Sequence, residues 1–165
     1  MKSPRTKPLR PAPPATTTER QRRKRVVLPL TAAERAALRR ARLVTADLAG
    51  MAAEEVAALA QLPLPRCRAL CALAQFQRLD SVGPSIAADL VGLGLTSLDQ
   101  LAKADPLRLY RELEQAVGRR VDPCVEDVFR CAVAQARDPA LPEAARNWWY
   151  WMRYRGTAVV APPAR

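Results

Sequence analysis

Histidine is absent from this 165-residue chain, and aromatic residues make up only 5% of it. Without histidine, the Ser-His and Cys-His pairs of nucleophilic catalysis are excluded, and the commonest metal ligand is missing. No apolar run approaches the ~20 residues that a membrane-spanning helix needs. No apolar segment follows the basic N-terminus, so we expect no secretory signal and no membrane association. A cytoplasmic protein is the default expectation.

Alanine and leucine supply much of the apolar content, which is 49% of the chain. Both residues favour helix, and the length suits one compact domain with a tail. We therefore expect an all-α fold with several short helices.

The net charge of +11 is concentrated near the N-terminus. Residues 1–30 hold nine basic residues against Glu19, a net charge of +8, which leaves +3 for the remainder. This segment is also rich in proline and poor in apolar residues, so we predict a disordered tail over 1–30. The high pI of about 10.5 is largely a property of this tail and does not argue that the core binds nucleic acid.

A basic cluster closes this tail. It either keeps the protein soluble or binds nucleic-acid phosphates without sequence preference, and in the second case the affinity for nucleic acid would fall steeply with salt concentration. An acidic protein surface or an anionic lipid would attract the same charges. Its candidate phosphate-binding residues are Arg22, Arg23, Lys24 and Arg25.

Capping signals divide residues 31–155, the predicted helical domain, into short helices. Thr31 is followed by Glu34 at the spacing of a capping box. Asp-Pro pairs at 105–106 and 122–123 combine an N-cap with a proline at the first helical position, and Gly118 predicts a helix end. Residues 156–165 are predicted to be a second tail. The predicted N-caps are Thr31, Thr45, Thr96 or Ser97, Asp105 and Asp122.

Residues 79–90, Leu-Asp-Ser-Val-Gly-Pro-Ser-Ile-Ala-Ala-Asp-Leu, place a tight turn between two apolar helical stretches. Such a turn is common in all-α proteins, but this pattern also resembles the helix-hairpin-helix motif. In that motif the hairpin amides and the first turn of the second helix face a nucleic-acid phosphate, because these N–H groups are unpaired and the helix dipole favours an anion. Ser81 stands where glycine is commoner, although a left-handed backbone suits glycine better. The candidate contacts are Ser81, Val82, Gly83, Pro84 and Ser85.

Four cysteines occupy predicted helix faces. Their spacings of four and seven are not those of a zinc knuckle, and free cysteine is among the most buried residue types. We therefore expect core cysteines and no metal or other cofactor, with a four-thiolate site as the alternative. Asp122, Glu126 and Asp127 are explained by helix capping and dipole compensation rather than by catalysis. The cysteines are Cys67, Cys71, Cys124 and Cys131.

Five of the eight aromatic residues lie within residues 147–154. We favour a lid that packs these rings onto the helical core. The alternative is a base-stacking platform assisted by Arg146, Arg153 and Arg155. The five aromatic residues are Trp148, Trp149, Tyr150, Trp151 and Tyr154.

A short repeat joins the two halves of the chain. Cys-Ala-Leu-Ala-Gln at residues 71–75 recurs as Cys-Ala-Val-Ala-Gln at residues 131–135. The repeat indicates two related helical units around the 79–90 turn, or chance in an alanine-rich chain.

Two longer stretches carry a family resemblance. These are the turn followed by Gly-Leu-Thr-Ser-Leu-Asp-Gln-Leu at 94–101, and Asp-Pro-Cys-Val-Glu-Asp-Val-Phe-Arg-Cys-Ala-Val at 122–133. With Trp-Trp-Tyr-Trp at 148–151, they make residues 70–152 resemble the bacterial pathogenicity locus family of small helix-hairpin-helix proteins. The resemblance implies an all-α helix-hairpin-helix fold and a DNA-binding role.

The sequence thus predicts a non-enzymatic accessory protein that binds DNA largely without sequence preference. The turn would hold a backbone phosphate, and the basic tail would supply most of the affinity. The alternative is a helix-hairpin-helix scaffold that binds a protein partner without direct DNA contact by its core. No small-molecule substrate is evident.

Overall fold

The computed structural model describes residues 24–159, and this part of the chain folds into helices without a β-strand. The predicted all-α fold is confirmed. The α-helices are α2 (Ala32–Arg40), α3 (Ala53–Ala60), α4 (Leu64–Phe76), α5 (Pro84–Gly92), α6 (Leu98–Lys103), α7 (Pro106–Val117) and α8 (Cys124–Arg137); the 3₁₀ helices are η1 (Asp47–Ala49), η2 (Glu143–Arg146) and η3 (Trp148–Tyr154).

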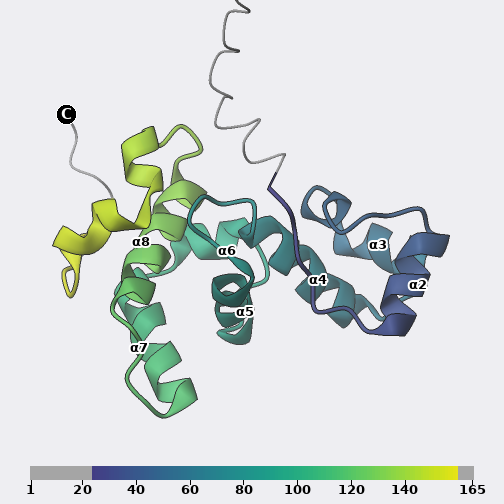
Figure 1. Cartoon of the computed structure of the whole chain (residues 1–165), viewed down its shortest axis with the longest axis horizontal. Helices are drawn as coiled ribbons and strands as arrows, with labels where there is room; N and C mark the ends of the chain where they lie inside the picture. The colour runs from purple at the N-terminus through teal and green to yellow at the C-terminus, as the bar shows by residue number, and fades with distance from the viewer. Residues whose placement is uncertain (1–23, 160–165) are drawn as a thin grey trace, which may run out of the picture.

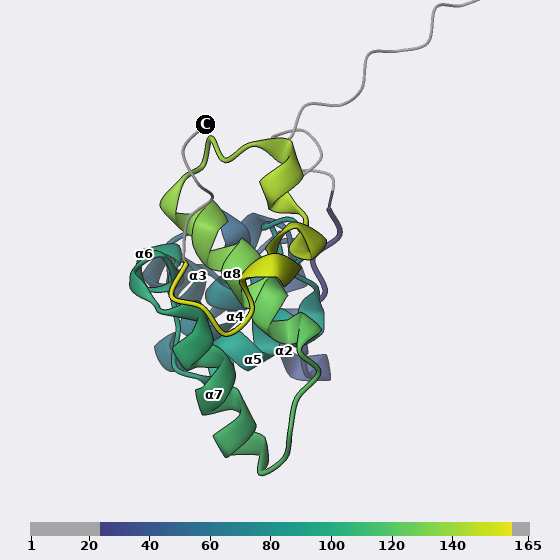
Figure 2. The ribbon, with the colours of Figure 1, turned by 90° about the vertical axis from the view of Figure 1, so that its left-hand side faces the viewer.

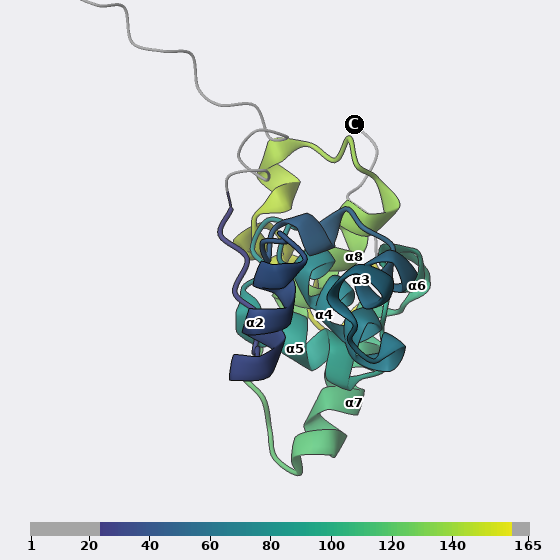
Figure 3. The same cartoon turned by 90° about the vertical axis from the view of Figure 1, so that its right-hand side faces the viewer.

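Helices α4 and α8 are each the central helix of one half of the described fold, and α5 and α6 lie between them (Figure 1). Helix α4 packs against α3, α5 and η1, while α8 packs against α6, α7 and η3. Both are buried on most of their sides, and their Cys-Ala-Leu/Val-Ala-Gln repeats lie in this buried part. Helices α2 and α3 cover one end of the molecule, as Figure 3 shows, and α7 and α8 form the other end (Figure 2).

Several helix boundaries follow from the caps that the sequence predicts. Thr31 and Glu34 form a complete capping box at the start of α2. Ser97 caps α6, and Asp105 caps α7, which ends at Gly118 in the left-handed conformation. These residues act locally, so their effect does not depend on the rest of the fold.

Two of the predicted caps act differently. The Thr45 hydroxyl does not cap a helix; it donates a hydrogen bond of 3.0 Å to the carbonyl oxygen of Val26. Asp122 accepts a 2.8 Å hydrogen bond from the Cys124 N–H, but Pro123 stands at the N-cap position and α8 begins at Cys124.

The packed part of the chain extends beyond both predicted domain boundaries. Val26 and Leu28 are buried in the core, so residues before position 31 belong to this packed part. At the other end, buried Arg130 on α8 donates hydrogen bonds to the carbonyl oxygens of Thr157 and Val159. Residues 24–30 and 156–159, which the prediction assigned to the two tails, therefore contact the helical part of the chain. Residues 1–23 and 160–165 lie outside the described part.

Candidate nucleic-acid interface

The turn between α4 and α5 spans residues 77–83. Val82 is fully buried and anchors the turn in the core. Gly83 is the N-cap of α5 with an extended backbone, and Pro84 is the first residue of the helix. The local geometry of this turn therefore agrees with the sequence pattern, while the helix-hairpin-helix interpretation itself stays a prediction.

Ser81 adopts the left-handed conformation, with φ at +64°. This conformation costs a side-chain-bearing residue more than it costs glycine. The hydroxyl of Ser81 offsets that cost, because it donates to the carbonyl oxygen of Arg146 at 3.1 Å and accepts from the N–H of Trp148 at 3.2 Å. Serine at this position thus joins the turn to the junction of η2 and η3, which glycine could not do.

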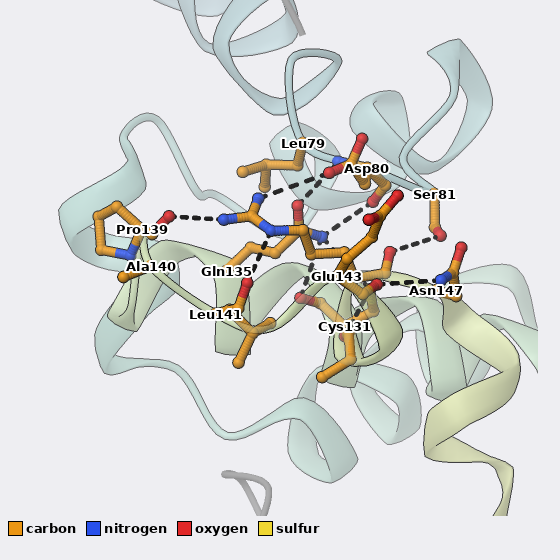
Figure 4. A network of polar contacts seen from close by, with 12 residues as sticks. Leu79, Asp80, Ser81, Cys131, Gln135, Pro139, Ala140, Leu141, Glu143 and Asn147 are labelled. Atoms are coloured by element: carbon orange, nitrogen blue, oxygen red, sulfur yellow. Dashed lines mark hydrogen bonds and ion pairs between the residues drawn. The ribbon is translucent and has the colours of Figure 1, made fainter. Parts of the chain in front are cut away.

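A second connection joins the turn to α8 (Figure 4). The side-chain amide of Gln135 accepts from the Asp80 N–H at 2.9 Å and donates to the Asp80 carbonyl oxygen at 3.0 Å. Arg146, which is buried, lies 3.5 Å from the Asp80 carboxylate and also donates to the carbonyl oxygens of Pro139 and Leu141. The turn is therefore held from the far end of the chain, over sequence separations of 55 to 67 residues.

Lys24 holds the same turn from the N-terminal side. Its ammonium group donates hydrogen bonds of 2.6 Å to the carbonyl oxygens of Leu79 and Val82. Burial lowers the pKa of Lys24, and the nearby charge of Asp80 opposes that effect. Lys24 therefore braces the turn, and its predicted contact with a phosphate stays a prediction. Of the other predicted cluster residues, Arg25 is exposed, and Arg22 and Arg23 lie outside the described residues.

The N-terminus of α5 is open to solvent. Pro84 and Ser85 are exposed, no side chain caps the helix, and its first turn carries no acidic residue. A Cβ atom built on Gly83 would have no atom within 4 Å. Unpaired N–H groups and the positive end of the helix dipole thus face an accessible surface, which is the local requirement for anion binding.

The aromatic segment packs as a lid on α8. Trp151 is fully buried, and its indole N–H donates to the carbonyl oxygen of Ala145 at 2.8 Å. Trp149 is the exception, with 57% of its surface exposed. Of the three arginines that a stacking platform would use, Arg146 is buried and Arg155 pairs with Asp127, which leaves Arg153 over the ring of Tyr150.

Three of the cysteines, Cys67, Cys71 and Cys131, are buried, and Cys124 is half-buried. Burial raises the thiol pKa of Cys71 and of Cys131 to about 11. Within residues 24–159 no group of three or more histidine, cysteine, aspartate or glutamate residues is placed to hold a metal ion. The core interpretation is thus confirmed for the three buried thiols.

The acidic residues at the start of α8 do more than compensate the helix dipole. The carboxylate of Glu126 accepts from Arg130 at 2.6 Å and from the Gly156 N–H at 2.8 Å. The fully buried carboxylate of Asp127 pairs with Arg155. Both acids therefore fix the segment after η3 onto α8, a role that the sequence reasoning missed.

Sequence reasoning also missed the two buried glutamines that bind main chain. Gln77 pairs with both main-chain groups of Val27, at 2.9 and 2.8 Å, as Gln135 does with those of Asp80. A polar residue on the apolar face of a predicted helix is the available signal, because a buried amide needs hydrogen-bond partners. The pattern does not identify those partners.

These features define a class: a small all-α protein organised around one braced interhelical turn, with an open helix N-terminus beside it. The sequence profile described as Cdd1, pathogenicity locus, matches residues 70–156. The chain belongs to this family, and the matched residues include the turn, α5 to α8 and the aromatic lid.

One similar protein is the mitomycin resistance protein McrB of Streptomyces lavendulae. It is 41% identical over 73 residues, which cover 44% of this chain and 66% of that protein. No solved structure shows a significant match to the chain. In the described part of the chain, no helix has the length and apolar character needed to cross a membrane.

Proposed function

We propose that this protein is a non-enzymatic DNA-binding accessory protein of the cytoplasm, and that its α4–α5 turn acts as a helix-hairpin-helix contact for a backbone phosphate. The observation that carries the proposal is the open N-terminus of α5, held in place by Lys24, Ser81 and Gln135. A preformed site pays little ordering entropy when it binds.

Binding of this kind is largely independent of base sequence, because main-chain N–H groups at a helix N-terminus recognise phosphate and not base edges. The basic residues at 1–25 would add affinity through counterion release. The candidates for that contribution remain Arg22, Arg23 and Arg25. Lys24 contributes by holding the turn in place.

A pair of variants on α5 tests the phosphate contact. Ser85→Glu places a negative charge in the first turn of the helix, where it stabilises the helix but repels a phosphate. Ala88→Glu adds the same charge at an exposed position outside the first turn. We expect Ser85→Glu to weaken binding of a fluorescent duplex at least tenfold more than Ala88→Glu does. Equal effects of the two variants would reject the turn as the contact.

A second experiment separates the core from the basic segment. Binding of full-length protein and of residues 24–165 is compared by fluorescence anisotropy over a series of salt concentrations. If residues 24–165 bind with a shallower salt slope, the helical core contributes its own contact. If the shortened protein does not bind DNA, the basic segment accounts for all of the binding by the full-length protein. Circular dichroism shows whether the shortened chain is folded.

The second candidate function is a helix-hairpin-helix scaffold for a protein partner. The observation that favours it is Trp149, which is exposed although the neighbouring rings pack on the core. Aromatic residues are enriched at the energetic centres of protein interfaces. Under this function, Trp149→Ala would abolish binding of the protein partner, and both wild type and variant would bind DNA only at background level.

The mitomycin resistance for which the Streptomyces relative is named offers a cellular test. If this protein shares the role in mitomycin resistance, deletion of its gene lowers survival on mitomycin. Ser85→Glu would then fail to restore survival if the turn acts through phosphate, whereas Ala88→Glu would restore it.

A further inference from the structure

A groove beside α2 takes no part in the proposed phosphate contact at α5, although Arg25 on its rim is also a candidate for the DNA affinity of the basic segment. It runs between α2, the extended segment 24–30 and residues 44–46, which meet on the side of the molecule seen in Figure 3. Two cavities of about 410 and 200 Å³ share Leu30, Arg35, Val44 and Thr45, so they form one continuous groove. We refer to it as the α2 groove.

The floor of the α2 groove is apolar and open. Val27 is 48% exposed and Val44 is 62% exposed, although both are large aliphatic residues. Half-buried Leu30 and Leu43 lie beside them. Clustered exposed aliphatic side chains of this kind mark an interaction surface more often than isolated ones do.

The rim of the α2 groove is positively charged. Arg25, Arg35 and Arg39 line it, all three are exposed, and none takes part in an ion pair among the described residues. No acidic residue lines either cavity. Glu34, on the same helix, pairs with Arg66 at 2.7 Å and so does not neutralise the rim.

We propose that the α2 groove binds a short acidic segment of a partner protein. Bulky apolar side chains of the partner would pack against Val27 and Val44, and its carboxylates would pair with the three arginines. This charge complementarity excludes the protein's own N-terminal residues, because residues 1–23 hold seven basic residues and one acid. It also favours a peptide over nucleic acid, because the groove has no aromatic side chain on which a base could stack.

The test uses random 12-residue peptides displayed on phage and selected against full-length protein. Enriched peptides are synthesised with a fluorescent label and titrated against wild type and four variants. Arg35→Glu and Val44→Ser alter the groove. Arg111→Glu and Val117→Ser make the same changes at exposed positions of α7 and serve as controls. The thermal stability of all four variants is measured in parallel.

We expect the enriched peptides to combine Asp or Glu with Leu, Ile or Phe. Their affinity should fall at least tenfold with Arg35→Glu and at least threefold with Val44→Ser, and change less than twofold with the α7 variants. Selection without acidic enrichment, or equal binding to the groove and α7 variants, overturns the proposal. A duplex DNA whose affinity falls with Arg35→Glu but not with Arg111→Glu, with no acidic peptide selected, assigns the groove to nucleic acid instead.

The outcome is separate from that of the proposed DNA contact. Ser85→Glu tests α5 and leaves the α2 groove unchanged, while Arg35→Glu does the reverse. If only one of the two variants has its expected effect, the proposal tested by the other variant fails.

Discussion

The side-chain amide of Gln135 pairs with both the N–H and the carbonyl oxygen of Asp80, 55 residues earlier in the chain. Gln135 is buried, and Asp80 belongs to the turn that precedes α5. This one side chain thus fixes the main chain of the turn against α8, much as a neighbouring strand would.

Gln135→Leu should destabilise the protein by about 1–3 kcal/mol, because it leaves two main-chain groups of Asp80 without partners. Urea unfolding followed by circular dichroism measures the change. Gln115→Leu, at an exposed position of α7, is the control and should stay within about 0.5 kcal/mol of wild type. A Gln135→Leu protein as stable as the control would show that water replaces the amide without cost.

Substitutions at Ser81 separate backbone strain from hydrogen bonding. Ser81→Ala keeps the left-handed strain and loses both hydrogen bonds, while Ser81→Gly loses the hydrogen bonds but relieves the strain. We expect Ser81→Ala to be less stable than Ser81→Gly by about 1 kcal/mol. The midpoints of urea unfolding give the order, and the reverse order would contradict this account of the turn.

Deletion of residues 1–30 should weaken the fold, whereas deletion of residues 1–23 should not. The longer deletion removes buried Val26 and Leu28 and leaves the amide of Gln77 without its Val27 partner. We expect a loss of roughly 2–4 kcal/mol, on the scale of burying one or two aliphatic side chains. Thermal unfolding of the two shortened proteins checks this, and equal melting temperatures would place the boundary at residue 31.

The Asp127–Arg155 pair should behave as a buried ion pair with one accessible partner. Arg155→Leu leaves the carboxylate of Asp127 buried and unpaired, at a cost of about 3–5 kcal/mol. A second substitution, Asp127→Leu, removes the orphaned charge, so we expect the double variant to recover part of the loss. Chemical unfolding of the single and double variants measures it; a double variant less stable than Arg155→Leu would refute the expectation.

The stability of the α2 end should depend on pH through Glu34. The Arg66 guanidinium, assisted by the Thr31 N–H, lowers the pKa of Glu34 from 4.5 to about 2. Because the folded protein binds this proton less readily than the unfolded chain, stability is present above pH 4.5 and is lost as the pH falls toward 2. Glu34→Gln, which keeps the capping box, should therefore lose less stability than wild type between pH 6 and pH 3. Parallel thermal unfolding at the two pH values compares them.

Local signals in the sequence were sufficient for much of the fold. Thr31, Ser97 and Asp105 cap helices as predicted, because a cap needs only residues two or three positions away. Thr45 shows the limit of this reasoning. Its hydroxyl binds Val26, a residue brought near by the fold rather than by the sequence.

The candidate site was predicted less completely, because what holds it comes from remote segments. The positions of Val82, Gly83 and Pro84 follow from the turn pattern. The bracing by Lys24 and Gln135 spans more than 50 residues, and no local pattern reveals it. The apolar run at residues 26–30 was an available sign that the compact part begins before Thr31.

The attachment of Lys24 to the turn has a consequence for binding strength. Since its ammonium group donates hydrogen bonds to the carbonyl oxygens of Leu79 and Val82, Lys24 is anchored at the turn before α5, and Arg22, Arg23 and Arg25 adjoin it in sequence. If the turn binds a phosphate as proposed, the basic residues next to Lys24 and the turn would be two contacts joined by a short stretch of chain. Once one of these contacts had formed, the other would meet the same DNA at an effective concentration on the order of millimolar. Two contacts that are each weak alone would then give the avidity of a single strong one.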